Sequence, residues 1–346
     1  MNLLHTSPFF ESQRRGRWRW PWLLLGILLS PVAILVAAKG YYLSVSALAE
    51  LTGGSWAKDF VESEELGTSP PTLSLNLLMV GILGWAAAIV GTLVQGRSIR
   101  SLVAPFHSFR WGLAGKTFFL ALSLDIILHA IPIPGMSHLE PHLQFTGLRL
   151  EHAFWFVPLF LCILLQTSGE DAFFKGYLLR QFGAVTGIFW IAPVVVTVGF
   201  VIIHVDNPDL TDNLSILIPM FVVTELLAIY LLMRSGSMEI PLALHGFNNV
   251  YAILFVAEEG TQSNDLSLWV YERIEDEAIN RANDIISLVY TLIFSGLLLL
   301  AFCWRRSPFY VPSMAEQVGA DPPATAPGSR LEDRENPQDE SKGCPQ

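Results

Sequence analysis

Cysteine and charge are both scarce in this chain of 346 residues. The three cysteines, Cys162, Cys303 and Cys344, are too few and too scattered for a disulfide framework or a cysteine-based metal site. Charged residues make up 15% of the chain, against about a quarter in an average soluble domain, and hydrophobic residues make up 52%. The net charge of −10 argues against nucleic acid as a partner. The composition therefore favours a protein that resides in lipid.

Long apolar runs are the most prominent feature that the chain does have. A helix needs about 20 mostly apolar residues to cross a hydrocarbon core, and the sequence predicts eight such spans. The fourth is overlong, which suggests two helical pieces broken at Ser168-Gly169. The predicted fold is an all-α, polytopic transmembrane helical bundle, with spans at 20–38, 73–94, 112–133, 152–182, 187–205, 214–233, 237–257 and 285–304.

The placement of basic residues predicts the orientation of the bundle. Most Lys and Arg residues fall in the ends and loops of one side, and the opposite loops are rich in Asp and Glu, so both termini are expected in the cytoplasm. Residues 1–19 form a basic cytoplasmic N-terminus and 20–311 the transmembrane domain. The stretch 312–346 is rich in Pro, Glu, Asp and Ser and reads as a disordered cytoplasmic tail. The acidic loop 258–284 is predicted to contain a helix. The chain is expected to be a multi-pass protein of the bacterial plasma membrane.

Polar residues inside the predicted spans are candidates for function, because ionisable groups are costly in a bilayer. Four of them fall at one depth. A rise of about 1.5 Å per residue from the expected turns at Phe182–Gly187 and Ser235-Gly236 brings each to roughly 13–26 Å from the cytoplasmic ends. We therefore expect one polar layer near the middle of the bilayer, made by Glu170, His204, His245 and Asn249, with Phe200 as a wall.

Such a layer has a chemical logic. A buried carboxylate near histidines can deprotonate water as a general base, while a second histidine and an amide donate to a developing oxyanion. Alternatively, Glu170, His204 and His245 could ligate one divalent metal such as zinc. Both schemes hydrolyse an acyl bond, and the residues alone leave both open.

Three motifs then resemble the CPBP intramembrane proteases, also called Abi or CAAX-protease-like proteins. This family includes the type II CAAX prenyl endopeptidases and lysostaphin-resistance-like proteins. Its Glu-Glu-x-x-x-Arg motif reads Glu170-Asp171-Ala172-Phe173-Phe174-Lys175 here, its Phe-x-x-x-His motif spans 200–204, and its His-x-x-x-Asn motif spans 245–249. The order and spacing of the three make the combination specific, over a core at about 150–255.

The resemblance implies a role for each matching residue. Glu170 is the water-activating base with His204 as its partner, while His245 and Asn249 stabilise the oxyanion. The family is described both as metal-dependent and as metal-free. Two supporting residues depart from the pattern: Asp171 shortens the second carboxylate by one methylene, and Lys175 loses the bidentate fork of arginine. The implied activity is an intramembrane endopeptidase that cuts a membrane-associated protein or peptide, including prenylated CAAX proteins.

Two other classes of function remain compatible with the sequence. A non-catalytic scaffold, such as an immunity or adaptor protein, is favoured by the departures at Asp171 and Lys175. A proton-coupled transporter would use Asp125, Glu225 and Glu170 as a relay, but no inverted repeat supports it. The pair Asp125 and His129 is expected to be structural. A metal site in the outer-loop segment 138–142 is disfavoured by its proline.

Overall fold

The computed structural model describes residues 8–14, 17–53, 69–129, 143–147, 150–205, 214–259, 266–271, 277–314 and 316. Of the predicted disordered tail 312–346, residues 315 and 317–346 lie outside these residues, as does the outer-loop segment 138–142. The described helices are α1 (Pro8–Ser12), α2 (Trp20–Thr52), α4 (Pro70–Val94), α5 (Arg100–Val103), α6 (Trp111–His129), α7 (Leu150–Asp171), α8 (Leu179–Thr186), α9 (Ile191–Ile202), α10 (Leu214–Ser235), α11 (Glu239–Val250) and α12 (Glu277–Cys303). Two π-helical segments, η1 (Ala172–Leu178) and η3 (Tyr251–Phe255), continue α7 and α11.

The predicted helical membrane bundle is confirmed. Within the described residues, six helices are long and apolar enough to cross a membrane: Trp20–Thr52, Pro70–Val94, Trp111–His129, His152–Thr186, Leu214–Ser235 and Arg281–Cys303. The predicted spans at 187–205 and 237–257 are the shorter helical regions α9 and α11–η3. Helices dominate because a bilayer offers no hydrogen bonds to the backbone, so each N–H and C=O must be satisfied within the chain.

The outer surface of the bundle is apolar. Leu28 and Leu35 on α2 are each 70% exposed, and Phe119 on α6 is 66% exposed. Many other large apolar side chains on α2, α6, α7, α9 and α12 are exposed as well, which is what a lipid-facing surface requires. The protein is therefore an integral membrane protein.

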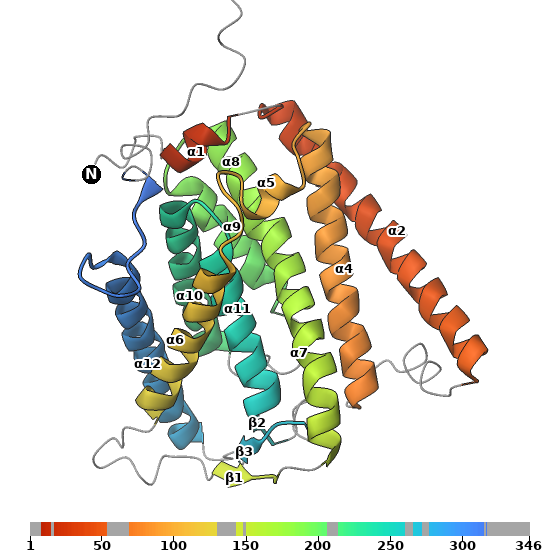
Figure 1. Ribbon diagram of the computed structural model, residues 1–346, viewed down its shortest axis with the longest axis vertical. Coiled ribbons are helices and arrows are strands. Elements are labelled where there is room, and N and C mark those ends of the chain that lie inside the picture. The colour runs from red at the N-terminus through yellow and green to blue at the C-terminus, as the bar shows by residue number, and fades with distance from the viewer. Residues whose placement is uncertain are drawn as a thin grey trace, which may run out of the picture.

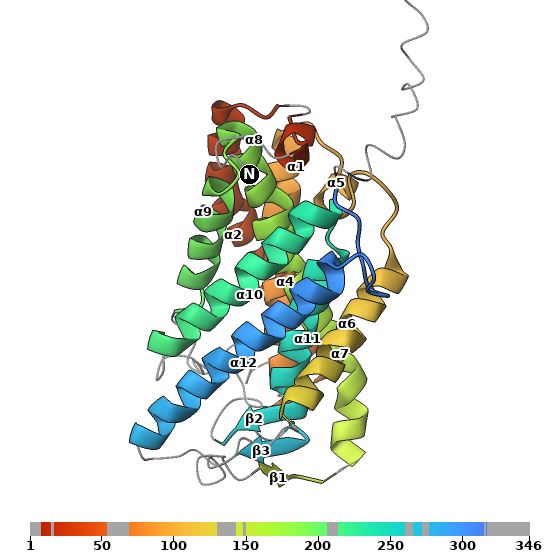
Figure 2. The same ribbon diagram turned by 90° about the vertical axis from the view of Figure 1, so that its left-hand side faces the viewer.

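The helices form a bundle in which α2, α4, α7 and α11 follow one another across one face (Figure 1). Helices α6, α10 and α12 close the other side and cross it obliquely (Figure 2). Helix α1 and residues 311–314 lie at the same end of the bundle, where Phe9, Phe10 and Met314 share one apolar cluster. That both termini face the cytoplasm stays a prediction.

A small sheet at the opposite end of the bundle was not predicted (Figure 1). Its strands are β1 (Leu143–Phe145), β2 (Val256–Glu258) and β3 (Trp269–Tyr271), in the order β1-β3-β2. Strand β3 pairs antiparallel with β1 and parallel with β2. The helical reading of loop 258–284 is therefore wrong for Trp269–Tyr271, whereas the residues from Glu277 onward do belong to α12.

The two turns from which the depth of the site was counted are confirmed. Gly187 follows α8 with φ +66°, and Gly236 follows α10 with φ +79°. Both angles lie in the left-handed region that favours glycine, which is the usual way to end a helix. The chain reverses at each of these glycines, so α9 and α11 begin at the same end of the bundle.

The break predicted at Ser168-Gly169 is wrong. Helix α7 runs through both residues, and helical structure continues through η1 and α8 to Thr186. Gly169 serves a contact between helices instead: a Cβ at this position would lie 2.2 Å from the carbonyl oxygen of Gly81 on α4. Small residues let membrane helices approach closely. The glycine therefore seats α7 directly against α4, one residue before Glu170.

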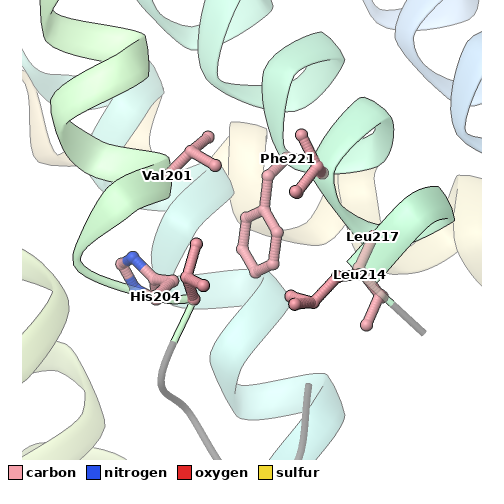
Figure 3. Close-up of a pocket in the computed structure, with 7 residues that line it drawn as sticks. Val201, His204, Leu214, Leu217 and Phe221 are labelled. Atoms are coloured by element: carbon pink, nitrogen blue, oxygen red, sulfur yellow. The ribbon is translucent and has the colours of Figure 1, made fainter. Parts of the chain in front are cut away.

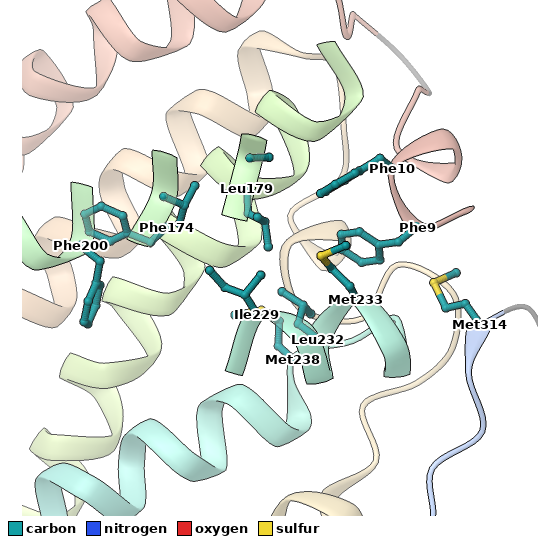
Figure 4. Packing of buried hydrophobic residues seen from close by; sticks show 12 residues of the cluster. Phe9, Phe10, Phe174, Leu179, Phe200, Ile229, Leu232, Met233, Met238 and Met314 are labelled. Carbon is teal, nitrogen blue, oxygen red and sulfur yellow. The ribbon is translucent and has the colours of Figure 1, made fainter. Parts of the chain in front are cut away.

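The largest apolar cluster extends from the middle of the bundle to the end that carries α1 (Figure 4). It includes Phe200 of α9, Phe174 of η1 and Ile229 of α10, and reaches Phe10 of α1. Phe174 and Ile229 are 7% and 1% exposed. This cluster excludes water from one side of the polar residues that lie next to it.

Candidate functional site

Helices α7 and α11 meet through two polar pairs. His245 Nε2 lies 3.4 Å from Glu170 Oε2, and Asn249 Nδ2 donates to Gln166 Oε1 at 2.9 Å. On each helix the two residues are four apart, so they share a face. The residue numbers rise along α11 while those of their partners fall along α7, so the two helices run antiparallel. Three of the four predicted catalytic residues are therefore brought together as expected, and Gln166 joins them.

His245 stands between two carboxylates. Its Nδ1 lies 3.0 Å from Asp171 Oδ1 while Nε2 faces Glu170. An ionised carboxylate only accepts hydrogen bonds, so Nδ1 must carry a proton and donate it to Asp171. Asp171 is completely buried and Glu170 is 8% exposed. Asp171 therefore sets the orientation and the tautomer of the His245 ring, and Nε2 of that ring points toward Glu170.

Asp171 belongs in turn to a buried ion cluster with Lys175 and Glu225. Lys175 Nζ lies 2.5 Å from Asp171 Oδ1 and 2.7 Å from Glu225 Oε2. Lys175 is 1% exposed and Glu225 is 5% exposed. The two departures from the family motif thus form a close pair. Glu225, which the sequence placed only in the relay of a transporter, supplies a second carboxylate from α10.

The π-helical segment η1 begins directly after Asp171 and contains Lys175. A π-turn inside an α-helix is uncommon and is frequent at functional sites. Here it occurs where the chain must aim Glu170 and Asp171 at α11 and Lys175 at α10. The first motif therefore spans the junction at which the regular helix changes into the π-helical segment.

Phe200 forms a wall of the site, as predicted. Its ring centroid lies 5.6 Å from that of His245 in an edge-to-face arrangement and 4.5 Å from that of His204. Lys175 Nζ lies 4.9 Å from the same ring, within cation–π range. The aromatic ring therefore contacts both histidines and the lysine, and it stands at the centre of the site.

His204 lies on the far side of Phe200. Its Nδ1 is 2.7 Å from the Phe200 carbonyl oxygen, which can only accept, so Nε2 carries the free lone pair. Among the described residues no hydrogen bond or ion pair joins His204 to Glu170. Instead the ring borders a small pocket between α9 and α10, opposite Phe221 (Figure 3).

The predicted zinc ligands are not gathered. Within the described part of the chain, no group of three or more His, Cys, Asp or Glu side chains is arranged to hold a metal ion. Glu170 and His245 are in contact, but His204 is turned into the pocket beside Phe221. The donor set therefore does not fit a metal in this arrangement, and we derive no step through one.

The remaining polar candidates lie apart from this site. His129 Nδ1 is 3.4 Å from Asp125 Oδ2 on α6, and the His129 ring packs against Tyr251 and Tyr290. This pair is held by aromatic neighbours, in agreement with the structural role expected for it. Asp125 and Glu225 lie in separate clusters, so the relay that a transporter would need has no continuous path among these contacts.

Two site residues were missed in the sequence. Gln166 lies one turn before Glu170, and that spacing alone could have placed it on the same helix face as Glu170. Glu225 is a carboxylate inside a predicted span. The sequence does not show which way α10 is rotated, so Lys175 could be identified as the partner of Glu225 only in the structure. Both are polar side chains whose burial makes a partner obligatory.

Comparison with known proteins agrees with the resemblance in the motifs. Residues 152–251 match the family described as "Type II CAAX prenyl endopeptidase Rce1-like". The chain is also similar to the uncharacterized protein YyaK of Bacillus subtilis (strain 168), at 24% identity over 209 residues. That alignment covers 59% of this chain and 66% of YyaK, slightly less than two thirds. No solved structure matches the chain. The matched segment contains Glu170, His204, His245 and Asn249.

Proposed function

We propose that this membrane protein is an endopeptidase that hydrolyses a peptide bond of a prenylated, membrane-associated peptide. The observation that carries the proposal is the position of His245 between Asp171 and Glu170. A histidine held by one carboxylate and aimed at another is the arrangement of a general acid–base site. The similarity of residues 152–251 to the CAAX prenyl endopeptidases supports both the reaction and the substrate class.

Glu170 takes the role of general base. Its Oε2 is buried, faces His245 Nε2 at 3.4 Å and accepts no hydrogen bond from the described residues, so a lone pair is available to a water molecule. As the water oxygen bonds to the carbonyl carbon of the substrate, its proton passes to Glu170. When the C–N bond then breaks, the same proton passes to the leaving amine, and the carboxylate is regenerated.

His245 and Asn249 stabilise the negative charge that forms on the carbonyl oxygen. With Nδ1–H held by Asp171, His245 offers Nε2 as a donor when the ring is protonated, and Asn249 contributes its amide. His204, whose Nδ1 is engaged by the Phe200 carbonyl oxygen, offers Nε2 to the attacking water or the substrate from the other side of the Phe200 ring. The buried lysine and carboxylates keep these donors in place.

The scaffold alternative rested on the departures at Asp171 and Lys175. Their close contact leaves the motif braced, so neither substitution argues against catalysis. The relative in Bacillus subtilis supports a bacterial plasma membrane as the location.

Purified protein in liposomes is expected to cleave a quenched fluorescent peptide that ends in farnesyl-cysteine and three further residues. The same peptide without the farnesyl group should react at least about tenfold more slowly, because burying a chain of apolar groups contributes about 0.8 kcal/mol per CH₂. Mass spectrometry of the released tripeptide identifies the bond that is cut. Folded protein that cleaves neither peptide would contradict the proposal, and equal rates would remove its prenyl specificity.

A further inference from the structure

Lys175 has three neighbours for its three N–H donors. Asp171 Oδ1 and Glu225 Oε2 lie 2.5 and 2.7 Å from Nζ, and the ring of Phe200 takes the third direction at 4.9 Å. An ammonium group has no other donors to offer. The position of Lys175 is therefore fixed by residues of three helices, α7, α10 and α9, and a change in any of the three neighbours would let it move.

The same oxygen of Asp171 that contacts Lys175 also accepts from His245. Oδ1 lies 2.5 Å from Lys175 Nζ and 3.0 Å from His245 Nδ1. A lysine that was free of Glu225 would direct its whole charge at Asp171 and compete more strongly with His245 for that oxygen. Glu225 thus weakens the attraction between Lys175 and Asp171, because it shares the charge of the lysine.

The surroundings make this balance energetically important. Glu225 is 5% exposed, and Ile229, one turn further along α10, belongs to the apolar cluster. Phe174, the neighbour of Lys175 in the chain, belongs to it as well (Figure 4). Charges that border a dry core interact more strongly than charges in water, and they lose more when a partner is removed.

We propose that Glu225 is a positioning residue of the active site, acting through Lys175 and Asp171 on His245. This inference rests on the proposed function. The chain of contacts runs from Glu225 to Lys175, from Lys175 to Asp171, and from Asp171 to His245 Nδ1. It links α10, which carries none of the catalytic residues, to the histidine that faces Glu170. A lysine lacks the fork of arginine, and the second carboxylate compensates by holding it from the other side.

Glu225→Gln is the test, because glutamine keeps the shape of the side chain and removes its charge. With the farnesylated peptide in liposomes, kcat should fall roughly 10- to 100-fold, the range typical of groups that orient a catalytic ligand. KM should stay within about threefold, because Glu225 does not touch the substrate. Wild-type kcat in Glu225→Gln would overturn the inference and leave the proposed function intact.

Glu239→Gln is the matched control. Glu239 is also a completely buried carboxylate in an ion pair, with Arg110 Nε at 3.2 Å, but that pair lies at the start of α11. Both variants should unfold at lower temperature, and only Glu225→Gln should lose kcat. An equal loss of kcat in both variants would mean that Glu225 contributes only to stability, which would overturn the inference.

A second measurement does not require cleavage. The ring ¹⁵N resonances of His245, assigned in histidine-labelled protein by comparison with His245→Gln, report the state of both nitrogens. They should shift in Glu225→Gln and stay in place in Glu239→Gln. Unchanged His245 resonances in Glu225→Gln would overturn the inference, even if the wild-type protein cleaved no farnesylated peptide and the proposed function itself had failed.

Discussion

Replacing Glu170 with glutamine is expected to lower kcat for the farnesylated peptide by about 10²–10⁴-fold while KM changes little. Glutamine has the size of glutamate but cannot take a proton from water. A glutamine side chain can occupy the same position, 3.4 Å from His245 Nε2, so we expect the variant to fold like the wild type. The loss therefore reports the missing base rather than a missing structure.

The measurement is steady-state cleavage in liposomes at equal amounts of folded protein, judged by size-exclusion chromatography and thermal unfolding. Glu50→Gln is a suitable control, because Glu50 lies exposed near the end of α2, outside the site. It should cleave at the wild-type rate. A Glu170→Gln variant that also cleaved at that rate would show that another group activates the water.

Replacing Lys175 with methionine is expected to lower the free energy of unfolding by about 3–5 kcal/mol, the usual cost of removing one partner of a buried ion pair. Methionine fills much of the same volume, but Asp171 and Glu225 would then face each other as uncompensated charges. Both carboxylates are at most 5% exposed, so water cannot reach them without disrupting the packing.

Unfolding by heat or by SDS in detergent micelles measures this loss. Lys116→Met is the matched control, because Lys116 lies exposed on α6 and has no ion pair among the described residues. An exposed substitution of this kind changes stability by about 0.5 kcal/mol or less. If Lys175→Met unfolded at the wild-type midpoint, the buried cluster would not be a structural element of the bundle.

Much of the site could be predicted because a helix rises by a constant distance per residue. The number of residues from a turn therefore gives the depth of a side chain in the bundle. The glycine turns at Gly187 and Gly236 fixed the start of α9 and α11, and a constant rise per residue then aligned His245 and Asn249 with Glu170. The two residues that share a helix face in the sequence do so in the structure. Polarity inside an apolar run is itself a signal, because an ionisable group in lipid needs a partner.

The rest depended on how the helices rotate and approach, which spacing does not reveal. The Phe200 ring packs against both His204 and His245, a contact that the spacing of the motifs did not reveal. Gly169 looked like a helix break because glycine is a weak helix former, but the close approach of α4 gives it a use within α7. The pairing of β1 with β3 joins segments more than a hundred residues apart, and three residues are too few to show an alternating pattern.

The central claim is that Glu170 and His245 act as one catalytic site, and a double-mutant cycle on kcat/KM tests it most directly. Wild type, Glu170→Gln, His245→Ala and the double variant would be compared on the farnesylated peptide in the same liposomes. Catalytic residues that act as a unit have strongly non-additive effects. The double variant should therefore be about as slow as the slower single variant. Losses that multiply in full, or a Glu170→Gln variant with wild-type kcat/KM, would contradict the account.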